Sequence, residues 1–374
     1  MANKSAIVIG AGILGIAAAR ALAINGYSVD VYERNHQASG ASVRNFGMIW
    51  PIGQPSGKLY DRALRSRDIW KEIGNNGGLW YDPVGSLHLA YNAKEWQVLQ
   101  ELYVAFRFEK REVQLLNKEQ VLAKSTIANK ELCFGGLFCS EEMIVDPRDA
   151  MEFLPKYFHE TLKIRFHLGN AVTHVQTGNI IVANKKIQAD LIIVCSGSDF
   201  ETIFPDEFAK YPLTKCKLQM MRLIEEGTRR IGPALCGGLS LIHYASFKVA
   251  ESFPILKKYY ETEMSEYLSW GIHVMISQNQ PGLLTVGDSH EYGMSPDPFD
   301  KSHINELILK YLAQFSSLKN AHIVESWNGV YGKFTSNQTE LFISPEPGVY
   351  ILNGVGGTGM TLSFGLAEEM MNTL

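Results

Sequence analysis

The chain has 374 residues, which is more than one hydrophobic core usually spans, so two domains are expected. Its 35 basic and 39 acidic residues give a net charge of -4 without a basic run that could track a phosphate backbone, so a nucleic-acid partner is not expected. No window reaches the roughly 18 uninterrupted apolar residues of a membrane span, so no transmembrane segment is expected.

The cysteines are odd in number, and none forms the CxxC pair that would indicate zinc or a redox dithiol. They are Cys133, Cys139, Cys195, Cys216 and Cys236. This pattern favours unpaired thiols in a reducing compartment. We therefore expect a cytoplasmic protein without a bound metal.

The first predicted element is an apolar strand over residues 6–9, followed by a glycine pattern and an alanine-rich helix. Gly10 allows a tight turn, Gly12 lets the backbone approach a pyrophosphate, and Gly15 lets helix and strand pack closely. The start of the helix presents free N–H groups and a positive dipole to the phosphates. The residues expected to contact the ligand are Gly10, Gly12, Ile13, Leu14 and Gly15.

A second parallel strand is predicted over residues 28–33, and it ends at Glu33. An acidic residue at this distance binds ribose hydroxyls, and its charge argues against a 2′-phosphate. Together with the glycine pattern, Glu33 and the adjacent Arg34 predict a dinucleotide site.

Small and polar residues then replace any periodic pattern over residues 38–49, which lets the backbone come close to a ligand. Glu33 followed by Gly-Ala-Ser-x-Arg-Asn-x-Gly resembles the FAD-dependent amine oxidoreductases, which include glycine oxidase, D-amino-acid oxidase and sarcosine oxidase. The resemblance implies that this loop contacts the pyrophosphate and passes beneath the flavin, so the cofactor is FAD rather than NAD. The loop residues concerned are Gly40, Ala41, Ser42, Arg44, Asn45, Phe46, Gly47 and Met48.

Helices are predicted over residues 56–73 and 93–106, and an alternating strand precedes the second helix. Asp146 is placed to cap a further helix, and Pro147 suits its first turn. This acid-proline pair resembles the point where the family's chain returns to the cofactor domain.

Short strands are predicted at 164–168 and 171–175, and a continuous apolar strand at 189–195. The last reads as a buried parallel strand whose carboxyl end faces a nucleotide, which brings Ser196 and Gly197 to FAD. An ordinary strand-to-loop glycine is the alternative. In the resembled family, Val172 lies on the adenine side.

Strands with helical interludes between residues 218 and 324 predict an antiparallel substrate-binding sheet. His243 and Tyr244 place an acid-base group beside a phenol, and residues 283–293 resemble the family's strand and turn next to the substrate pocket, which includes His290. The alternative for His243 and Tyr244 is a structural pair whose polar atoms are hydrogen-bonded within the core.

The chain ends in a strand, a glycine-rich loop and a helix through residue 371. A helix N-terminus stabilises negative charge, and the loop resembles the family's closing motif under the isoalloxazine ring. A metal or phosphate site is the alternative. The predicted cofactor residues here are Gly354, Gly356, Gly357, Thr358, Gly359, Met360 and Thr361.

The stretch 327–333 departs from the resembled family. In glycine oxidase and D-amino-acid oxidase, Trp-x-Gly-x-Arg-Pro supplies an arginine that grips the substrate carboxylate, whereas here Tyr331 stands in its place and Gly329 adjoins the cofactor. A phenol cannot replace a planar charged fork. An anionic substrate then needs Lys333, Arg44, His290 or His243, and such point-charge donors suit a phosphonate as well as a carboxylate.

The sequence thus predicts an α/β fold. A doubly wound, Rossmann-like FAD domain over residues 1–50, 140–215 and 325–374 carries an inserted antiparallel-sheet substrate domain over 51–139 and 216–324. FAD is expected to be non-covalent, because residues 327–339 lack the cysteine that holds flavin in some sarcosine oxidase relatives.

The resemblance implies oxidation of a small primary or secondary amine, an amino acid or an aminophosphonate, by hydride transfer to flavin N5, with His243, Tyr244, His290, Tyr331 and Lys333 as pocket residues. The imine product hydrolyses, and oxygen or an electron carrier accepts the electrons. The alternatives are a quinone- or carrier-linked dehydrogenase and a non-catalytic FAD-binding protein.

Overall fold

The computed structural model describes residues 4–227, 229–280 and 282–374. Within this part of the chain, one sheet has the order β20-β21-β13-β1-β2-β9. Its strands are β1 (Ser5–Ile9), β2 (Ser28–Glu33), β9 (Arg165–Leu168), β13 (Leu191–Val194), β20 (Leu341–Glu346) and β21 (Val349–Asn353). Strand β1 is parallel to both neighbours, and only the edge strand β20 pairs antiparallel among these six. The continuous apolar runs of β1 and β13 follow from burial on both faces.

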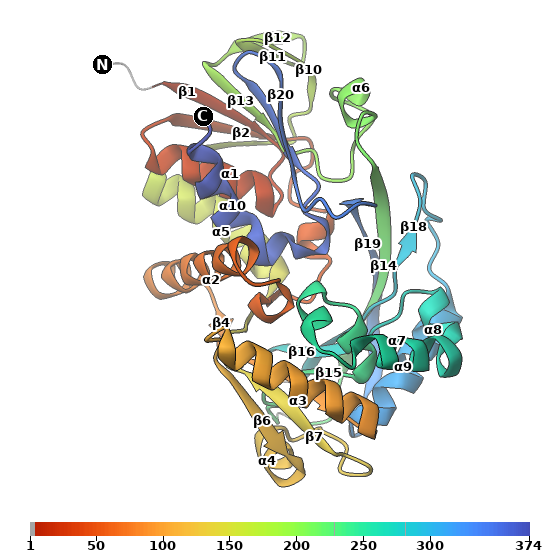
Figure 1. Cartoon of the computed structure of the whole chain (residues 1–374). Helices are drawn as coiled ribbons and strands as arrows, with labels where there is room; N and C mark the ends of the chain where they lie inside the picture. The colour runs from red at the N-terminus through yellow and green to blue at the C-terminus, as the bar shows by residue number, and fades with distance from the viewer. Residues whose placement is uncertain (1–3, 228, 281) are drawn as a thin grey trace.

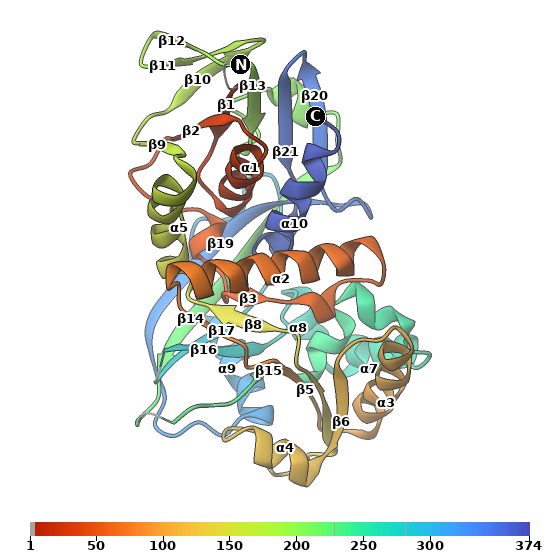
Figure 2. The same ribbon diagram turned by 90° about the vertical axis from the view of Figure 1, so that its left-hand side faces the viewer.

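Helices cover one face of this sheet (Figures 1 and 2). They are α1 (Ile13–Ile24), α5 (Pro147–Leu162) and α10 (Gly359–Met371), and α2 (Lys58–Gly77) crosses beside α10. The small side chains of α1 allow close packing on both the sheet and α10, and nearly all of its residues are buried. The indole N–H of Trp70 on α2 donates to the Met360 carbonyl at 2.9 Å, which ties α2 to the start of α10.

A three-stranded antiparallel meander covers the other face (Figure 1). It consists of β10 (Val172–Gln176), β11 (Asn179–Val182) and β12 (Lys185–Gln188). Its buried residues Val172, Val175 and Ile180 share a core with Ile7 and Ile192 of the parallel sheet. The predicted α/β fold is confirmed, with helices on one side of the sheet and strands on the other.

The second large sheet has the order β18-β14-β17-β16-β15-β5-β7-β6, and β19 pairs with β14. Its strands are β5 (Ser86–Ala90), β6 (Val113–Asn117), β7 (Gly135–Cys139), β14 (Leu213–Ile224), β15 (Ala234–Cys236), β16 (Met275–Gln280), β17 (Leu283–Gly287), β18 (Glu291–Tyr292) and β19 (His322–Phe334). The pairing is antiparallel as expected, except where β5 and β15 run parallel. Those two strands come from separate stretches of the chain and share no hairpin, so no turn forces them to oppose each other.

Helices pack around this second sheet (Figure 1). They are α3 (Ala93–Phe108), α4 (Lys118–Lys124), α7 (Phe253–Glu263), α8 (Ser265–Ser269) and α9 (Ser302–Phe315). The shorter elements are α6 (Pro205–Phe208), β3 (Met48–Ile49), β4 (Tyr81–Asp82), β8 (Met143–Val145), and the 3-10 turns η1 (Ala41–Val43), η2 (Pro51–Gly53), η3 (Gly238–Ile242), η4 (Ala245–Val249) and η5 (Gly356–Thr358). Among the described residues, no helix is both long and apolar enough to cross a membrane.

Strands β14 and β19 run side by side from the level of the first sheet down into the second (Figure 1). They pair from Leu213 opposite Phe334 to Ile224 opposite His322. The domain boundaries expected at residues 216 and 325 therefore fall inside two continuous strands, and the boundaries stay a prediction.

Candidate functional site

The turn between β1 and α1 has the backbone geometry that its glycines predict. Gly10 has φ +101°, and a Cβ there would overlap the Cys195 carbonyl. A Cβ on Gly15 would overlap the Gly10 carbonyl, so helix and strand come as close as the pattern predicts. Gly12 is the N-cap of α1 and offers no side-chain cap, and the buried Ile13 and Leu14 follow it.

Glu33, at the end of β2, lies next to this turn. Its carboxylate accepts the Ala11 N–H at 2.9 Å with one oxygen and the Asn35 N–H at 2.9 Å with the other. The neighbouring Arg34 is drawn away into an ion pair with Asp199 at 2.7 Å.

The loop after β2 folds over the start of α1. The Ser42 hydroxyl accepts the Ile13 N–H at 3.0 Å, so the loop occupies one of the free donors of the helix. The Asn45 amide donates to the carbonyls of Ala41 and Ser42, at 3.0 and 2.9 Å, and accepts the Gly47 N–H at 2.8 Å. These bonds hold the loop in one shape.

The rest of this loop is anchored on the second sheet. Gly40 is the N-cap of η1, Gly47 has φ +72°, and the buried Met48 begins β3. The buried Phe46 presents its carbonyl to the Ser277 hydroxyl at 3.2 Å.

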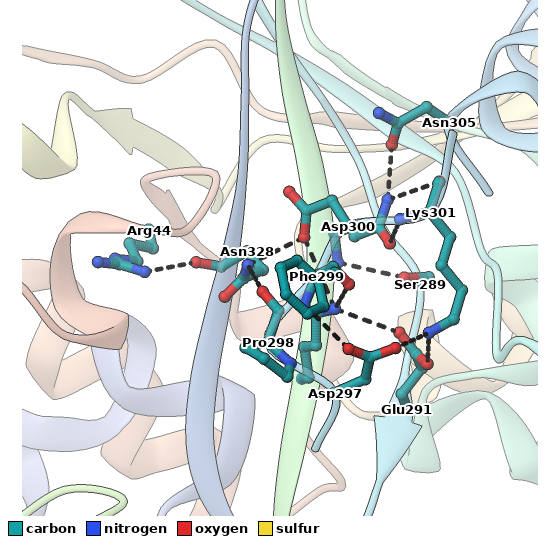
Figure 3. A network of polar contacts seen from close by, with 12 residues as sticks. Arg44, Ser289, Glu291, Asp297, Pro298, Phe299, Asp300, Lys301, Asn305 and Asn328 are labelled. Carbon is teal, nitrogen blue, oxygen red and sulfur yellow. Dashed lines mark hydrogen bonds and ion pairs between the residues drawn. The ribbon is translucent and has the colours of Figure 1, made fainter. Parts of the chain in front are cut away.

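Arg44 links the loop to β19, as Figure 3 shows. Its guanidinium donates to the Asn328 carbonyl at 2.8 Å, and a Cβ on Gly329 would lie 3.1 Å from the Arg44 carbonyl oxygen. The Asn328 amide donates in turn to Asp300 at 2.9 Å. The Arg44 guanidinium is thus bonded to a backbone carbonyl, whereas the sequence analysis offers Arg44 as one possible partner for an anionic substrate.

The glycine-rich segment before α10 closes the same region. Gly354 and Gly356 have φ of +74° and +60°, which side chains disfavour. A Cβ on Gly357 would lie 3.2 Å from the Tyr331 hydroxyl, and one on Gly359 would lie 3.4 Å from the Ile13 side chain. The N-termini of α1 and α10 therefore converge.

Side chains in the first turn of α10 make internal bonds. The Thr358 hydroxyl donates to the Val355 carbonyl at 2.6 Å, and the Thr361 hydroxyl accepts the Trp50 N–H at 2.9 Å. Met360 is buried, and its carbonyl accepts the bond from Trp70. Thr358 keeps acceptor capacity on its hydroxyl and Thr361 keeps its O–H donor, so these residues can offer a cofactor those groups besides backbone and apolar surface.

At the end of β13, a side-chain hydroxyl likewise forms a hydrogen bond within its own segment. The Ser196 hydroxyl donates to the Asp199 carbonyl at 2.7 Å, and Gly197 has φ +64°. Val172 lies in the meander, at the start of β10.

This arrangement fits FAD. Two helix N-termini and a set of glycines without side chains can take a pyrophosphate and the anionic edge of a flavin, and Glu33 can take ribose hydroxyls. The Cβ overlaps at Gly10 and Gly15 show that the turn depends on glycine.

The candidate substrate residues form a neighbouring group on the second sheet. The rings of His243 and Tyr244 lie 5.1 Å apart, and those of His243 and His290 also 5.1 Å. The buried Tyr331 and the half-buried Lys333 lie on β19, and Lys333 Nζ approaches the Tyr292 hydroxyl at 3.4 Å. The His290 ring in turn stacks at 6.3 Å on Tyr292.

Two residues that the sequence analysis did not single out complete this group. His273 lies 3.6 Å from His243, ring to ring, and its Nε2 is 3.2 Å from Asp288 Oδ1. His273 precedes β16 and Asp288 follows β17, and the register of these strands places them opposite each other. The sequence pattern does not contain this strand register, so it does not reveal that His273 and Asp288 lie side by side.

Burial sets the charge of this group. It lowers the pKa of His290 to about 4 and holds the pKa of His273 well below its usual value, and the nearby Lys333 ammonium lowers both further. Burial also raises the pKa of the Asp288 carboxyl and of the Tyr331 phenol well above their ordinary values. The two imidazoles and the phenol are therefore neutral at pH 7.

The polar network in Figure 3 fixes the neighbouring segment of the second sheet. The Lys301 ammonium pairs with Glu291 at 2.6 Å, and the buried Lys217 lies 3.7 Å from the same carboxylate and 3.6 Å from Asp300. The Ser289 hydroxyl accepts the Gln219 N–H at 3.1 Å. Residues on either side of His290 are thus held to β14.

The fold and this site define a flavin-dependent oxidoreductase. The sequence profile of the family described as FAD dependent oxidoreductase matches residues 5–373. The chain therefore belongs to this family, known as DAO, and its cofactor is FAD. Whether the flavin is covalently bound is not tested by the match, and non-covalent binding stays a prediction.

Solved structures with the same fold cover nearly the whole chain. Glycine oxidase from Geobacillus kaustophilus is 17% identical with a TM-score of 0.78, and L-proline dehydrogenase from P. horikoshii is 18% identical with a TM-score of 0.80. Each alignment covers 99% of this chain and 94% of the other.

The chain also resembles curated proteins in part. The tRNA 5-methylaminomethyl-2-thiouridine biosynthesis bifunctional protein MnmC of Campylobacter concisus (strain 13826) is 27% identical over 220 residues. That match covers 54% of this chain and 31% of the relative, so the chain spans about a third of the length of that relative.

Proposed function

We propose that this protein oxidises a small primary or secondary amine that carries an anionic group, either an amino acid or an aminophosphonate. Bound FAD supplies the acceptor for a hydride from the carbon next to nitrogen. The chain has to hold that carbon in place with the amine unprotonated, after which the imine product hydrolyses in water. Electrons leave to oxygen or to an electron carrier.

The observation that carries the proposal is the pair Tyr331 and Lys333 on β19. The two side chains lie on the same face of the strand, because residues two apart do. Tyr331 reaches Gly357 of the glycine-rich segment, and Lys333 forms a β-bridge with Val355 in that segment. An ammonium and a phenol therefore border the place where the flavin is expected.

This pair accommodates a substrate with a tetrahedral anion. Lysine is a compact point charge and makes no planar fork, so it has no preference for a flat carboxylate. The phenol adds one neutral hydrogen bond. Such a set suits a doubly charged phosphonate at least as well as a carboxylate, and makes ordinary α-amino acids the weaker candidates.

The names of similar proteins support an amine as the substrate. Glycine oxidase and L-proline dehydrogenase are named for substrates with a primary and a secondary amine. The curated relatives are named for the biosynthesis of a methylaminomethyl group, which is a secondary amine. Because the match spans only part of those relatives, we propose the amine and not the tRNA for this chain.

Replacement of Lys333 tests the anion site. We expect Lys333→Met to raise the half-saturating concentration of an aminophosphonate by about 10- to 100-fold, the cost of a lost charge-assisted hydrogen bond. The limiting rate of flavin reduction should change much less, because the bond serves binding and not chemistry. Anaerobic stopped-flow measurement of flavin bleaching separates the two constants.

The matched control is Lys310→Met, which removes an exposed lysine on α9. It should leave both constants unchanged. If Lys333→Met binds the aminophosphonate normally, or loses mainly the limiting rate, Lys333 does not hold the anion.

A further inference from the structure

We propose that His243, His273 and His290, together with Asp288, bind a divalent transition-metal ion of the zinc type. One ring nitrogen from each histidine lies within 4.8 Å of the other two. The Asp288 carboxylate adds oxygens 3.2 Å from His273 Nε2 and 3.9 Å from His290 Nε2. Zinc with bonds of about 2.0–2.1 Å keeps its ligand atoms roughly 3.3 Å apart, so ring nitrogens up to 4.8 Å apart have to close by as much as about 1.5 Å to coordinate one ion.

The backbone fixes most of this arrangement. The N–H of His273 donates to the Asp288 carbonyl at 3.3 Å, and the N–H of Asp288 donates back at 3.1 Å. The His290 N–H donates to the Trp270 carbonyl at 2.8 Å. His243, which follows η3, is the exposed member of the four, and its N–H also donates to a backbone carbonyl, that of Ser240 at 3.2 Å.

Unpartnered buried atoms point to a bound cation. His273 and Asp288 are only 4% and 5% exposed, yet His273 Nδ1 and Asp288 Oδ1 make no hydrogen bond among the described residues, because the 3.2 Å contact between His273 Nε2 and Asp288 Oδ1 lacks hydrogen-bond geometry. Buried polar atoms in proteins are nearly always paired, so two such atoms in one group need an explanation. A metal ion held here would satisfy Asp288 Oδ1 directly and would take one ring nitrogen from His273.

The tautomer of His290 also leaves one ring nitrogen available to bind a metal ion. Its Nδ1 lies 2.9 Å from the Gly271 carbonyl oxygen, which can only accept, so Nδ1 carries the proton. The Nε2 lone pair is then directed toward Asp288 and the other rings. Metal-binding histidines are oriented by this kind of bond from the second nitrogen to a carbonyl.

Two features oppose the ion, and both can be tested. The His243 and His273 rings are tilted by only 32° at 3.6 Å and the His273 and His290 rings by 17° at 5.2 Å, so the rings have to turn before their planes contain one metal. The Lys333 ammonium, whose charge lowers the pKa of His273, repels a cation in this group. The metal site does not depend on the proposed amine substrate.

Metal binding to the purified flavoprotein tests this proposal directly. The protein is stripped with a chelator and titrated with Zn²⁺ by calorimetry, and Co²⁺ is titrated at wavelengths beyond the flavin absorption. We expect one ion per chain, with tetrahedral Co²⁺ bands, and a loss of affinity of about 100-fold or more for His273→Asn. Asp288→Asn should also weaken binding, because it removes a charged ligand, and Lys333→Met should tighten binding.

Because His273 is buried, its replacement could disturb folding, so His243→Asn is the second variant and should lose a similar affinity with flavin content unchanged. His174→Asn, an exposed histidine on β10, is the matched control and should bind as the parent does. The proposal is overturned if less than about one ion binds per five chains, if His243→Asn and His273→Asn bind like the parent, or if Lys333→Met weakens binding.

Discussion

His88 illustrates how a single buried residue sets pH dependence. It lies in the middle of β5, with Phe247 at 5.0 Å and Trp50 at 6.0 Å between ring centroids. Neither ring nitrogen has a hydrogen-bond partner among the described residues. Burial lowers the pKa of His88 to about 3, so the folded protein keeps this ring neutral.

The sign of the effect follows from the two states. The unfolded chain takes up a proton on His88 near its ordinary value of about 6.5, whereas the folded protein does not until about pH 3. Stability is therefore intact above pH 6.5 and falls as the pH drops toward 3, with a loss of about 2 kcal/mol from this residue by pH 5.

We predict that His88→Leu reduces the loss of unfolding free energy between pH 7 and pH 5 by about 2 kcal/mol. Urea unfolding at both pH values measures it. The exposed His174→Asn variant should lose as much stability as the parent. An unchanged slope in His88→Leu would show that His88 is protonated in the folded state or reached by water.

At the scale of elements, the turn from β1 to α1 contains glycines with different tasks. Gly15 has the Gly10 carbonyl where its Cβ would be, so any side chain there disrupts packing. Gly12 has φ -70°, and a Cβ there would meet only the Ser42 hydroxyl at 3.2 Å. The Ser42 hydroxyl, which accepts the Ile13 N–H, would have to shift slightly, so the chain opposes a side chain at Gly12 much less than at Gly15, and the main constraint comes from the ligand.

We predict that Gly12→Val lowers FAD affinity by about 100-fold or more, because the side chain fills the space of the pyrophosphate. The apoprotein should lose only about 1 kcal/mol of stability, from a poorer N-cap. Flavin fluorescence and thermal unfolding of the apoprotein give the two values. Gly293, where a Cβ meets nothing within 4 Å, provides the Gly293→Val control.

A Gly12→Val protein with its full complement of FAD would mean that the first turn does not hold the cofactor. An unfolded apoprotein would instead place Gly12 in the packing role that the structure gives to Gly15.

The elements that the sequence predicted best are those with local signals. The strand, glycines and helix from Ser5 to Ile24 are readable because turn chemistry and apolar period act within a few residues. Asp146 caps α5 as expected, and its carboxylate accepts the Arg148 N–H at 2.8 Å. The parallel pairing of β5 with β15 and the position of His273 depend on register between distant segments, which no local pattern contains.

At the scale of the whole molecule, the site is assembled from segments far apart in the chain. The loop after β2, the end of β19 and the start of α10 meet through contacts at Arg44, Gly329, Tyr331 and Gly357. Strands β14 and β19 pair along their whole length and run from the level of the first sheet into the second (Figure 1). The candidate substrate residues on β19 are therefore connected rigidly to the region of the cofactor loops. This continuity fits an enzyme in which the amine is held in a fixed position against the flavin.

The most direct test of this account is anaerobic reduction of the bound flavin by a panel of amines. The panel contains glycine, D-alanine, sarcosine, a primary aminophosphonate and its N-methyl derivative. We predict that at least one aminophosphonate bleaches the flavin faster than glycine, D-alanine or sarcosine does at equal concentration. Bleaching fastest with glycine or D-alanine would contradict the assignment of the anion site to Tyr331 and Lys333, and no bleaching by any amine would contradict amine oxidation itself.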